Sequence, residues 1–246
     1  MPSRLKPYVT TFYDAVRHYL QSDDPVERRY LKTIWDNIDH AEAQLFQDCF
    51  ALSVLGSDRP RTYCEFGAKD GKFLSNTHLL DTQYGWSGIV AEPARCWHDK
   101  LWQNRPDAMK DTRCVWQRTG ATLDFIEAGD GEFSTLSAHA ASDHHTERRA
   151  TNSRHYQVET VSLAELLEAH GYGDGVDFLS IDTEGSEVEI LENFDLSKRP
   201  VGVICVEHNM TKQESVLDDL ITSQNYRRCL EPWSRWDAWY VHESLL

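Results

Sequence analysis

A strand–helix–strand pattern over residues 63–93 is the feature that most constrains the fold of this chain. Two short apolar runs, 62–66 and 86–91, flank a segment of helical character, which is typical of a βαβ unit. The first run leads into the turn EFGAKDG, where Gly67 and Gly71 allow the backbone to turn sharply and to approach a ligand closely. The sequence therefore predicts an α/β fold with a mostly parallel sheet and helices on both faces.

The strand ends of this unit carry acidic side chains that suit a cationic ligand with a ribose. Glu92 ends the second strand 21 positions after Gly71, about where a Rossmann-like unit places a carboxylate on a ribose diol. Glu65 precedes the first glycine, Asp70 lies between the two glycines, and the phosphate-binding pattern G-x-G-x-x-G is absent. S-adenosylmethionine (SAM), with its sulfonium and ammonium groups, fits this charge better than a pyrophosphate. The alternative is an ordinary Gly-Asp turn between two strands.

Composition limits the function class and the compartment. The chain has 246 residues, 40% of them hydrophobic, which suffices for one substantial core. Its formal net charge of −15, without a Lys/Arg run longer than a dipeptide, disfavours nucleic-acid binding. The sequence contains neither a membrane-spanning apolar stretch nor the apolar core of a signal peptide. The six cysteines are scattered without C-x-x-C, and Cys64, Cys114 and Cys205 lie inside predicted strands, which favours small buried thiols there and a reducing cytoplasm.

The first 58 residues are expected to form a helical extension. Asp24 and Pro25 provide an N-cap and a proline at the first helical position, and Glu27 has the spacing of a capping box. Apolar residues recur at helical period at Val26, Tyr30, Ile34, Ile38, Ala41, Leu45, Cys49 and Leu52. We expect residues 1–58 to pack against an α/β domain of residues 59–246; a lid over the ligand is the alternative.

The middle of the chain gives less specific signals. Strands are expected at 112–117 and 123–128. Thr119 follows the first of these strands, where the adenine of the cofactor would lie, and is a candidate for hydrogen bonding to it. The polar segment 137–155 is expected to be a mobile loop that covers the substrate. Four potential metal ligands lie in this loop, without a second ligand pair at defined spacing: His139, Asp143, His144 and His145.

A second informative stretch, VDFLSIDTEGSEVEIL, predicts a strand at 176–181 that turns into a helix. The apolar run 201–206 is typical of a central parallel strand. Ligands of open α/β sheets bind outside the carboxyl ends of the strands. Polar residues follow four strands at that edge: Glu65, Glu92, Asp182, Glu184, Glu207 and His208. They could be helix caps and solvated acids, but their convergence favours an active site.

Five motifs in order resemble one enzyme family. EFGAKDG, SNT (residues 75–77), GWSGIVAEP, LSIDTEGSE and VEHN are similar to the motifs of the FkbM-type family of SAM-dependent methyltransferases. The resemblance implies a Rossmann-like core, SAM as cofactor, and O-methylation of a sugar or natural-product acceptor. It assigns a set of residues to the cofactor site, with Asp182 also at the floor of the active site: Glu65, Gly67, Ala68, Asp70, Gly71, Glu92 and Asp182. Many members have Asn where this chain has Lys69, which we expect to point to solvent or to pair with an acid.

Methyl transfer to a hydroxyl requires alignment of two reactants and removal of a proton. Asp182 and His208 are the candidate bases, with Glu207 as the third candidate catalytic residue. These residues and Glu184 could instead bind a divalent cation that lowers the pKa of the acceptor hydroxyl. Two other function classes remain as alternatives: a nicotinamide-dependent oxidoreductase, for which a pyrophosphate cradle is missing, and a non-catalytic interaction module with this fold. The acceptor, the metal dependence and the oligomeric state are open.

Overall fold

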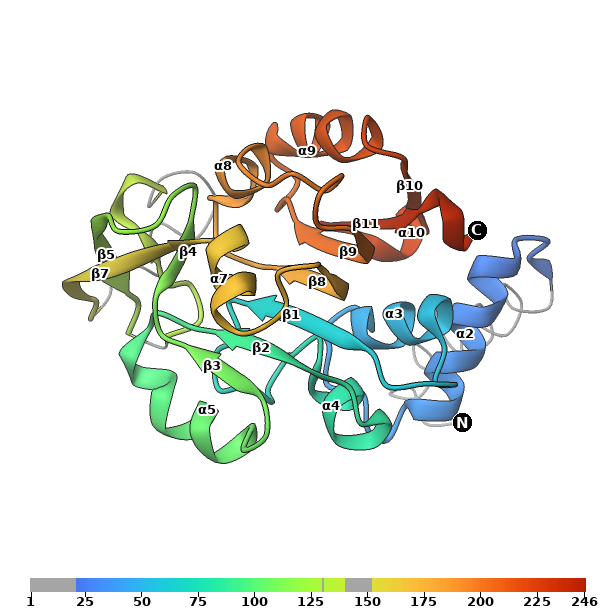
Figure 1. Cartoon of the computed structure of the whole chain (residues 1–246). Helices are drawn as coiled ribbons and strands as arrows, with labels where there is room; N and C mark the ends of the chain where they lie inside the picture. Colours follow the sequence, from blue (N-terminus) through green and yellow to red (C-terminus); the bar gives the residue numbers. More distant parts are fainter. Residues whose placement is uncertain (1–20, 130, 140–151) are drawn as a thin grey trace, which may run out of the picture.

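A seven-stranded sheet forms the centre of the molecule in the computed structural model, which describes residues 21–129, 131–139 and 152–246 (Figure 1). Its strands are β1 (Thr62–Phe66), β2 (Ser87–Ala91), β3 (Met109–Asp111), β8 (Val176–Ile181), β9 (Val201–Glu207), β10 (Tyr226–Cys229) and β11 (Asp237–His242). Their order is β10-β11-β9-β8-β1-β2-β3, parallel from β9 to β3, with β11 antiparallel to both its neighbours. This confirms the predicted Rossmann-like, mostly parallel sheet.

Helices cover both faces of this sheet, as the sequence predicts (Figure 1). One face packs against α7 (Leu163–Ala169), α8 (Glu187–Glu192) and α9 (Gln213–Thr222). The other face packs against α2 (Pro25–Asn37), α3 (Gln47–Leu55), α4 (His78–Tyr84) and α5 (His98–Asn104). Within β9, Ile204 and Val206 belong to the first apolar cluster and Val203 and Cys205 to the second, because side chains alternate along a strand. None of the helices in the described ranges is long and apolar enough to cross a membrane.

A smaller sheet lies beside the main one and corrects the prediction for residues 112–117. It consists of β4 (Cys114–Trp116), β7 (Arg154–Ser162), β5 (Thr122–Glu127) and β6 (Thr135–Leu136), in that order. The third strand of the main sheet is therefore β3, while β4 pairs in parallel with β7. The predicted loop 137–155 is shorter than expected, because η2 (Ser137–His139) begins it and β7 starts at Arg154. Residues 140–151 of that loop lie outside the described part.

The helical extension begins as predicted and then departs from the prediction. Asp24 caps α2 by accepting a hydrogen bond from the N–H of Val26 (2.8 Å), whereas Glu27 accepts one from the Trp233 indole (2.7 Å). The helical period expected from residue 38 onwards is wrong up to residue 46. Phe46 has a left-handed backbone (φ +59°), and α3 begins only after it. Residues 1–20 of the predicted extension lie outside the described part.

The extension shares its core with the sheet. Tyr30 of α2, Phe50 of α3 and Trp239 of β11 are fully buried, and the rings of Phe50 and Trp239 stack with centroids 4.8 Å apart. Trp233 lies in α10 (Glu231–Ser234), and its ring packs edge-on against that of Tyr30, with centroids 6.0 Å apart. Through these contacts α2, α3 and Trp233 pack against the sheet and belong to this core.

Candidate active site

A cavity opens at the carboxyl ends of β1, β2 and β8, where the sequence places the ligand. Its lining includes Gly67, Lys69, Glu92, Asp182 and Glu184 from the main sheet, and Cys114, Val115, Phe125 and Leu136 from the smaller one. The free space inside measures about 40 Å³, whereas ligand pockets usually measure roughly 300–1,000 Å³. A ligand the size of SAM therefore requires side chains of the lining to move.

Gly67 and Gly71 make room for protein atoms in the turn after β1. Gly67 has φ +79°, and a Cβ there would lie 1.8 Å from the carbonyl oxygen of Asp182. Gly71 has φ +77°, and a Cβ there would lie 2.6 Å from both Arg105 Cγ and Leu101 Cδ1. Both glycines are thus needed for the tight packing of the turn on Asp182 and α5, and Gly67 also lines the cavity. Their assignment to a SAM loop stays a prediction.

Glu92 lies at the end of β2, buried and in the lining of the cavity. Its Oε2 accepts a hydrogen bond from the backbone N–H of Lys69 (2.8 Å) and its Oε1 one from Ala94 (2.7 Å). Burial raises the pKa of Glu92 to about 7, although the two backbone N–H groups oppose the shift. Each oxygen has a second lone pair that could accept from a ribose hydroxyl, so the position suits the predicted role.

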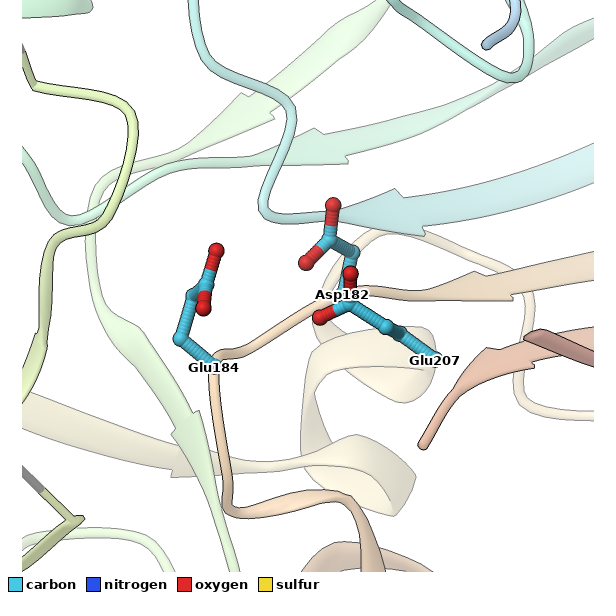
Figure 2. A group of neighbouring side chains, drawn as sticks. All are labelled: Asp182, Glu184 and Glu207. Atoms are coloured by element: carbon cyan, nitrogen blue, oxygen red, sulfur yellow. The ribbon is translucent and has the colours of Figure 1, made fainter. Parts of the chain in front are cut away.

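Three carboxylates meet next to this cavity. Asp182 follows β8, Glu207 ends the neighbouring strand β9, and Glu184 projects from the loop after β8 (Figure 2). One carboxylate oxygen from each lies within 4.8 Å of the others. Burial and the charges of Asp182 and Glu184 raise the pKa of Glu207 well above its ordinary value. The structure thus brings together three of the residues that the sequence predicts to converge; below we call them the carboxylate cluster.

His208 does not join the carboxylate cluster. It follows Glu207 directly, is buried, and its Nδ1 accepts a hydrogen bond from the N–H of Met210 (3.0 Å). Its Nε2 lies 3.8 Å from Glu214 of α9, and burial lowers its pKa. The imidazole therefore faces the α9 side of the sheet, and the lining of the main cavity does not include it.

Glu65 lies beneath the turn, in a separate polar network. Its carboxylate accepts hydrogen bonds from Ser75 Oγ (2.8 Å), the Asn76 N–H (2.7 Å) and Thr77 Oγ1. Arg105, which is fully buried, lies 3.6 Å from the same carboxylate. The guanidinium also donates to Asp81 Oδ2 (2.8 Å), Tyr63 Oη (2.6 Å) and the Gly71 carbonyl (3.2 Å). We call Glu65, Arg105 and these partners the Arg105 network.

The remaining predicted residues lie outside the lining of the cavity. Ala68 is buried, and Asp70 Oδ1 accepts hydrogen bonds from the N–H groups of residues 72 and 73, which closes the turn. Thr119 Oγ1 accepts a hydrogen bond from the Ser162 N–H (2.9 Å) at the start of α7. His139 Nε2 lies 3.7 Å from Glu189. The other three candidate metal ligands, Asp143, His144 and His145, lie outside the described part.

Two side chains at the site have places that the sequence analysis missed or left open. Glu187 Oε1 accepts hydrogen bonds from the N–H groups of Thr183 (3.0 Å) and Gly185 (3.1 Å), so it shapes the loop that carries Glu184. Lys69 does not point to open solvent but lines the cavity. Burial alone would lower the pKa of Lys69, but the carboxylates of the cluster and of Glu132 raise it. An acid four residues after Thr183 was the available signal for the first; Lys69 had none beyond its departure from the family pattern.

Comparison with known proteins identifies one family. The model of the methyltransferase FkbM domain matches residues 65–228. No curated protein sequence is significantly similar to the chain. Among solved structures, a methyltransferase FkbM from Methylobacillus flagellatus KT is similar at 12% identity, with TM-score 0.47, over 96% of this chain and 60% of that one. A TehB-like SAM-dependent methyltransferase from Corynebacterium glutamicum is similar at 10% identity, with TM-score 0.41, over 89% of this chain and 100% of that one.

The family match covers the part of the chain that carries the site. The matched range begins at Glu65, at the end of β1, and extends into β10 at Arg228. It includes the turn after β1, Glu92 and the whole carboxylate cluster. The chain spans about 60% of the length of the Methylobacillus protein. On the family match, the chain belongs to the FkbM family of methyltransferases.

Proposed function

We propose that this protein transfers the methyl group of SAM to a hydroxyl group of a sugar or natural-product acceptor. The observation that carries the proposal is the pairing of a ribose-type acid, Glu92, with the Asp182 carboxylate in one strand-end cavity. The adenosine half of SAM would lie along Glu92 toward the apolar side chains of the smaller sheet, and its charged half toward the acids. In this orientation the apolar part of SAM contacts apolar side chains, and its cationic groups face carboxylates.

Asp182 is the base that the geometry favours. Methyl transfer is an in-line displacement at the sulfonium carbon, so the acceptor oxygen must lose a proton as it attacks. Asp182 lines the cavity, whereas His208 faces α9. Glu207, with its raised pKa, holds its proton more firmly than an ordinary carboxylate. It is therefore a poorer proton acceptor at neutral pH and a better hydrogen-bond donor to the acceptor.

A divalent cation at the carboxylate cluster is the second arrangement that the donor set fits. Oxygen ligands from Asp182, Glu184 and Glu207 are of the type that magnesium and manganese prefer. A cation there would lower the pKa of the acceptor hydroxyl. In that arrangement EDTA abolishes activity and magnesium restores it, whereas a base-only site is insensitive to EDTA.

The proposed binding of SAM through Glu92 is tested by measuring the SAM affinity of Glu92→Gln by calorimetry. A charge-assisted hydrogen bond to a buried diol contributes roughly 1.5–3 kcal/mol, so its loss should weaken binding about tenfold or more. Glu127→Gln is a matched control, because Glu127 is equally buried but lies outside the cavity lining; its SAM affinity should stay within about twofold of the parent. Equal SAM affinity of the parent and a folded Glu92→Gln would contradict the assignment.

Thermal stability with different ligands separates the function classes. A methyltransferase is stabilised by SAM and S-adenosylhomocysteine and not by NAD, because binding to the native state raises the melting temperature. Stabilisation by NAD alone would indicate the oxidoreductase. Stabilisation by none of the three would indicate the interaction module. The segment 137–155 should gain resistance to proteolysis with SAM and acceptor if it covers the substrate.

A further inference from the structure

A buried acid on the strand next to the carboxylate cluster lies outside the range that the family model matches. Asp237 is the first residue of β11 and the direct partner of Glu207, at the end of β9. We propose that Asp237 belongs to the acceptor site and accepts a hydrogen bond from a hydroxyl group next to the one that is methylated. This inference rests on the proposed function, and it specifies an acceptor with two neighbouring hydroxyl groups, as on a sugar ring.

The hydrogen bonds between β9 and β11 place the Glu207 and Asp237 side chains next to each other. The N–H of His208 donates to the Trp236 carbonyl (2.9 Å), so residues 208 and 236 form a hydrogen-bonded pair and the adjoining pair, Glu207 and Asp237, is of the non-hydrogen-bonded type. Residues directly opposite each other share one face of the sheet, with Cβ atoms about 4.5–5.5 Å apart and closest in pairs of this type. Asp237 therefore borders the carboxylate cluster on the β11 side.

Each of these two carboxylates has one oxygen that accepts no hydrogen bond from the part of the chain that the structure describes. Asp237 Oδ2 accepts from Gln47 Nε2 (2.7 Å) and Trp239 Nε1 (3.3 Å). Glu207 Oε2 accepts from Asn209 Nδ2 (2.7 Å). Asp237 is only 5% exposed, and a buried polar atom without a partner costs stability. Its Oδ1, which we call the open oxygen, is therefore suited to a donor from a ligand.

The orientation of Asp237 is fixed from the helical extension. Gln47 Oε1 accepts a hydrogen bond from the Leu45 N–H (2.9 Å), which directs the Nε2 group of the same amide toward Asp237. The Leu45 carbonyl accepts a hydrogen bond from the buried hydroxyl of Tyr30 in α2 (2.8 Å). Gln47 and Asp237 both lie outside the matched residues 65–228. The two parts of the chain that flank the family domain thus hold the open oxygen in place.

The order of the strands places Asp237 on the acceptor side of the site. From β2 to β11 along the sheet, the cavity and its border carry Glu92, Asp182, Glu207 and Asp237 in that order. In the proposed function SAM lies between Glu92 and Asp182. An in-line displacement requires the acceptor oxygen opposite the sulfur, so the acceptor approaches from β9 and β11. Two neighbouring carboxylates at that position suit two neighbouring hydroxyl groups.

The test is binding of methyl glycosides to the complex with S-adenosylhomocysteine, measured by NMR titration. The probes are the methyl glycosides of glucose, galactose, mannose and xylose and their singly deoxygenated analogues. In Asp237→Asn, the donors Gln47 and Trp239 retain the amide oxygen, so the NH₂ group replaces the open oxygen. The affinity for the best glycoside should fall about tenfold or more, and the preference for it over its deoxy analogue should disappear. S-adenosylhomocysteine affinity should stay within about twofold of the parent.

Asp48→Asn is the matched control, because Asp48 is a buried acid of α3 whose two oxygens accept backbone N–H groups. A loss of glycoside affinity in Asp237→Asn that Asp48→Asn does not share supports the proposal. Equal glycoside affinity of the parent and Asp237→Asn overturns it, as does a parent that binds S-adenosylhomocysteine but none of the glycosides. Asp237→Ser, which removes the open oxygen, repeats the test if the Asn variant does not fold. A parent that binds neither SAM nor S-adenosylhomocysteine would instead contradict the proposed function.

Discussion

Two polar clusters lie at the same edge of the sheet and differ in whether the protein itself balances their charge. In the Arg105 network, the strand-end acid Glu65 meets a buried guanidinium and three further hydrogen-bond donors. In the carboxylate cluster, Asp182 and Glu207 meet each other and Glu184. The first cluster is satisfied within the protein. The second retains charge and faces a cavity, which is what a reaction site needs.

This difference shows that an acid after a parallel strand does not by itself indicate a function. Glu65 is the penultimate residue of β1 and Asp182 follows the last residue of β8, and the two strands are paired neighbours in the sheet. What separates them is whether the protein supplies all the partners. Where the protein supplies all the partners of an acid, substitution of that acid should lower stability. Where partners are missing, substitution should reduce activity and leave stability unchanged.

The largest effect should follow Arg105→Met. This change leaves Glu65 and Asp81 without their buried cation, and breaking a buried ion pair on one side costs about 3–5 kcal/mol of unfolding free energy. Urea denaturation at pH 7 measures it, with Arg113→Met, a half-exposed arginine, as the control. A loss below about 1 kcal/mol would mean that the network is not the support of the turn.

A smaller effect should follow substitution of Asp237, whose surroundings are intermediate between those of the two clusters. This buried carboxylate accepts hydrogen bonds from Gln47 (2.7 Å) and Trp239 (3.3 Å) and pairs with no cation in the described part of the chain, and burial raises its pKa to about 7. Because the folded pKa exceeds the unfolded value of 3.8, its stabilising contribution is present at low pH and lost as pH rises from about 4 through 7.

Asp237→Asn keeps the acceptor oxygen and removes the titration. At pH 8 the variant should therefore be more stable than the parent by about 1–3 kcal/mol, and the difference should shrink as pH falls and close near pH 4. Urea denaturation at several pH values checks this. A constant difference across that range would show that the carboxyl group does not take up a proton on folding.

The last and sharpest contrast compares two Glu→Gln changes, one in β1 and one at the end of β9, on either side of β8 in the sheet. Glu65→Gln weakens a charge-assisted network and should lower the unfolding free energy by about 1–3 kcal/mol. Glu207→Gln resembles the protonated acid and relieves repulsion, so stability should stay within about 1 kcal/mol of the parent or rise. Melting curves at pH 7.5 distinguish the two. Equal destabilisation by both would remove the distinction between the clusters.

The sequence predicted the parts of the fold whose signals are local. The runs 176–181 and 201–206 match β8 and β9 because central parallel strands are continuously apolar. β3 was missed because Met109–Asp111 is a three-residue edge strand with a single large apolar side chain. The helical period after residue 38 was misread because apolar residues in an irregular segment also face the core.

The sequence predicted which acidic residues converge at the candidate site, but not which side chains pair with them. Asp182 and Glu207 were expected to meet because their strands adjoin, and they do. The role of Arg105 could not be foreseen, since its partners come from two other segments of the chain, 63–65 and 71–81. No local pattern distinguishes a strand-end acid with such a partner from one without it.

The pairing of β1 with β8 has a consequence for how the chain is made. Asp177 accepts hydrogen bonds from the N–H and the hydroxyl of Thr62, 115 positions earlier, and Tyr63 pairs with Phe178. At about 5–20 residues per second, a ribosome needs roughly 6–23 s to add those residues. During that interval one edge of β1 has no strand to pair with. Synthesis speed and chaperone supply therefore bear on the yield of this protein as much as the stability of the finished fold.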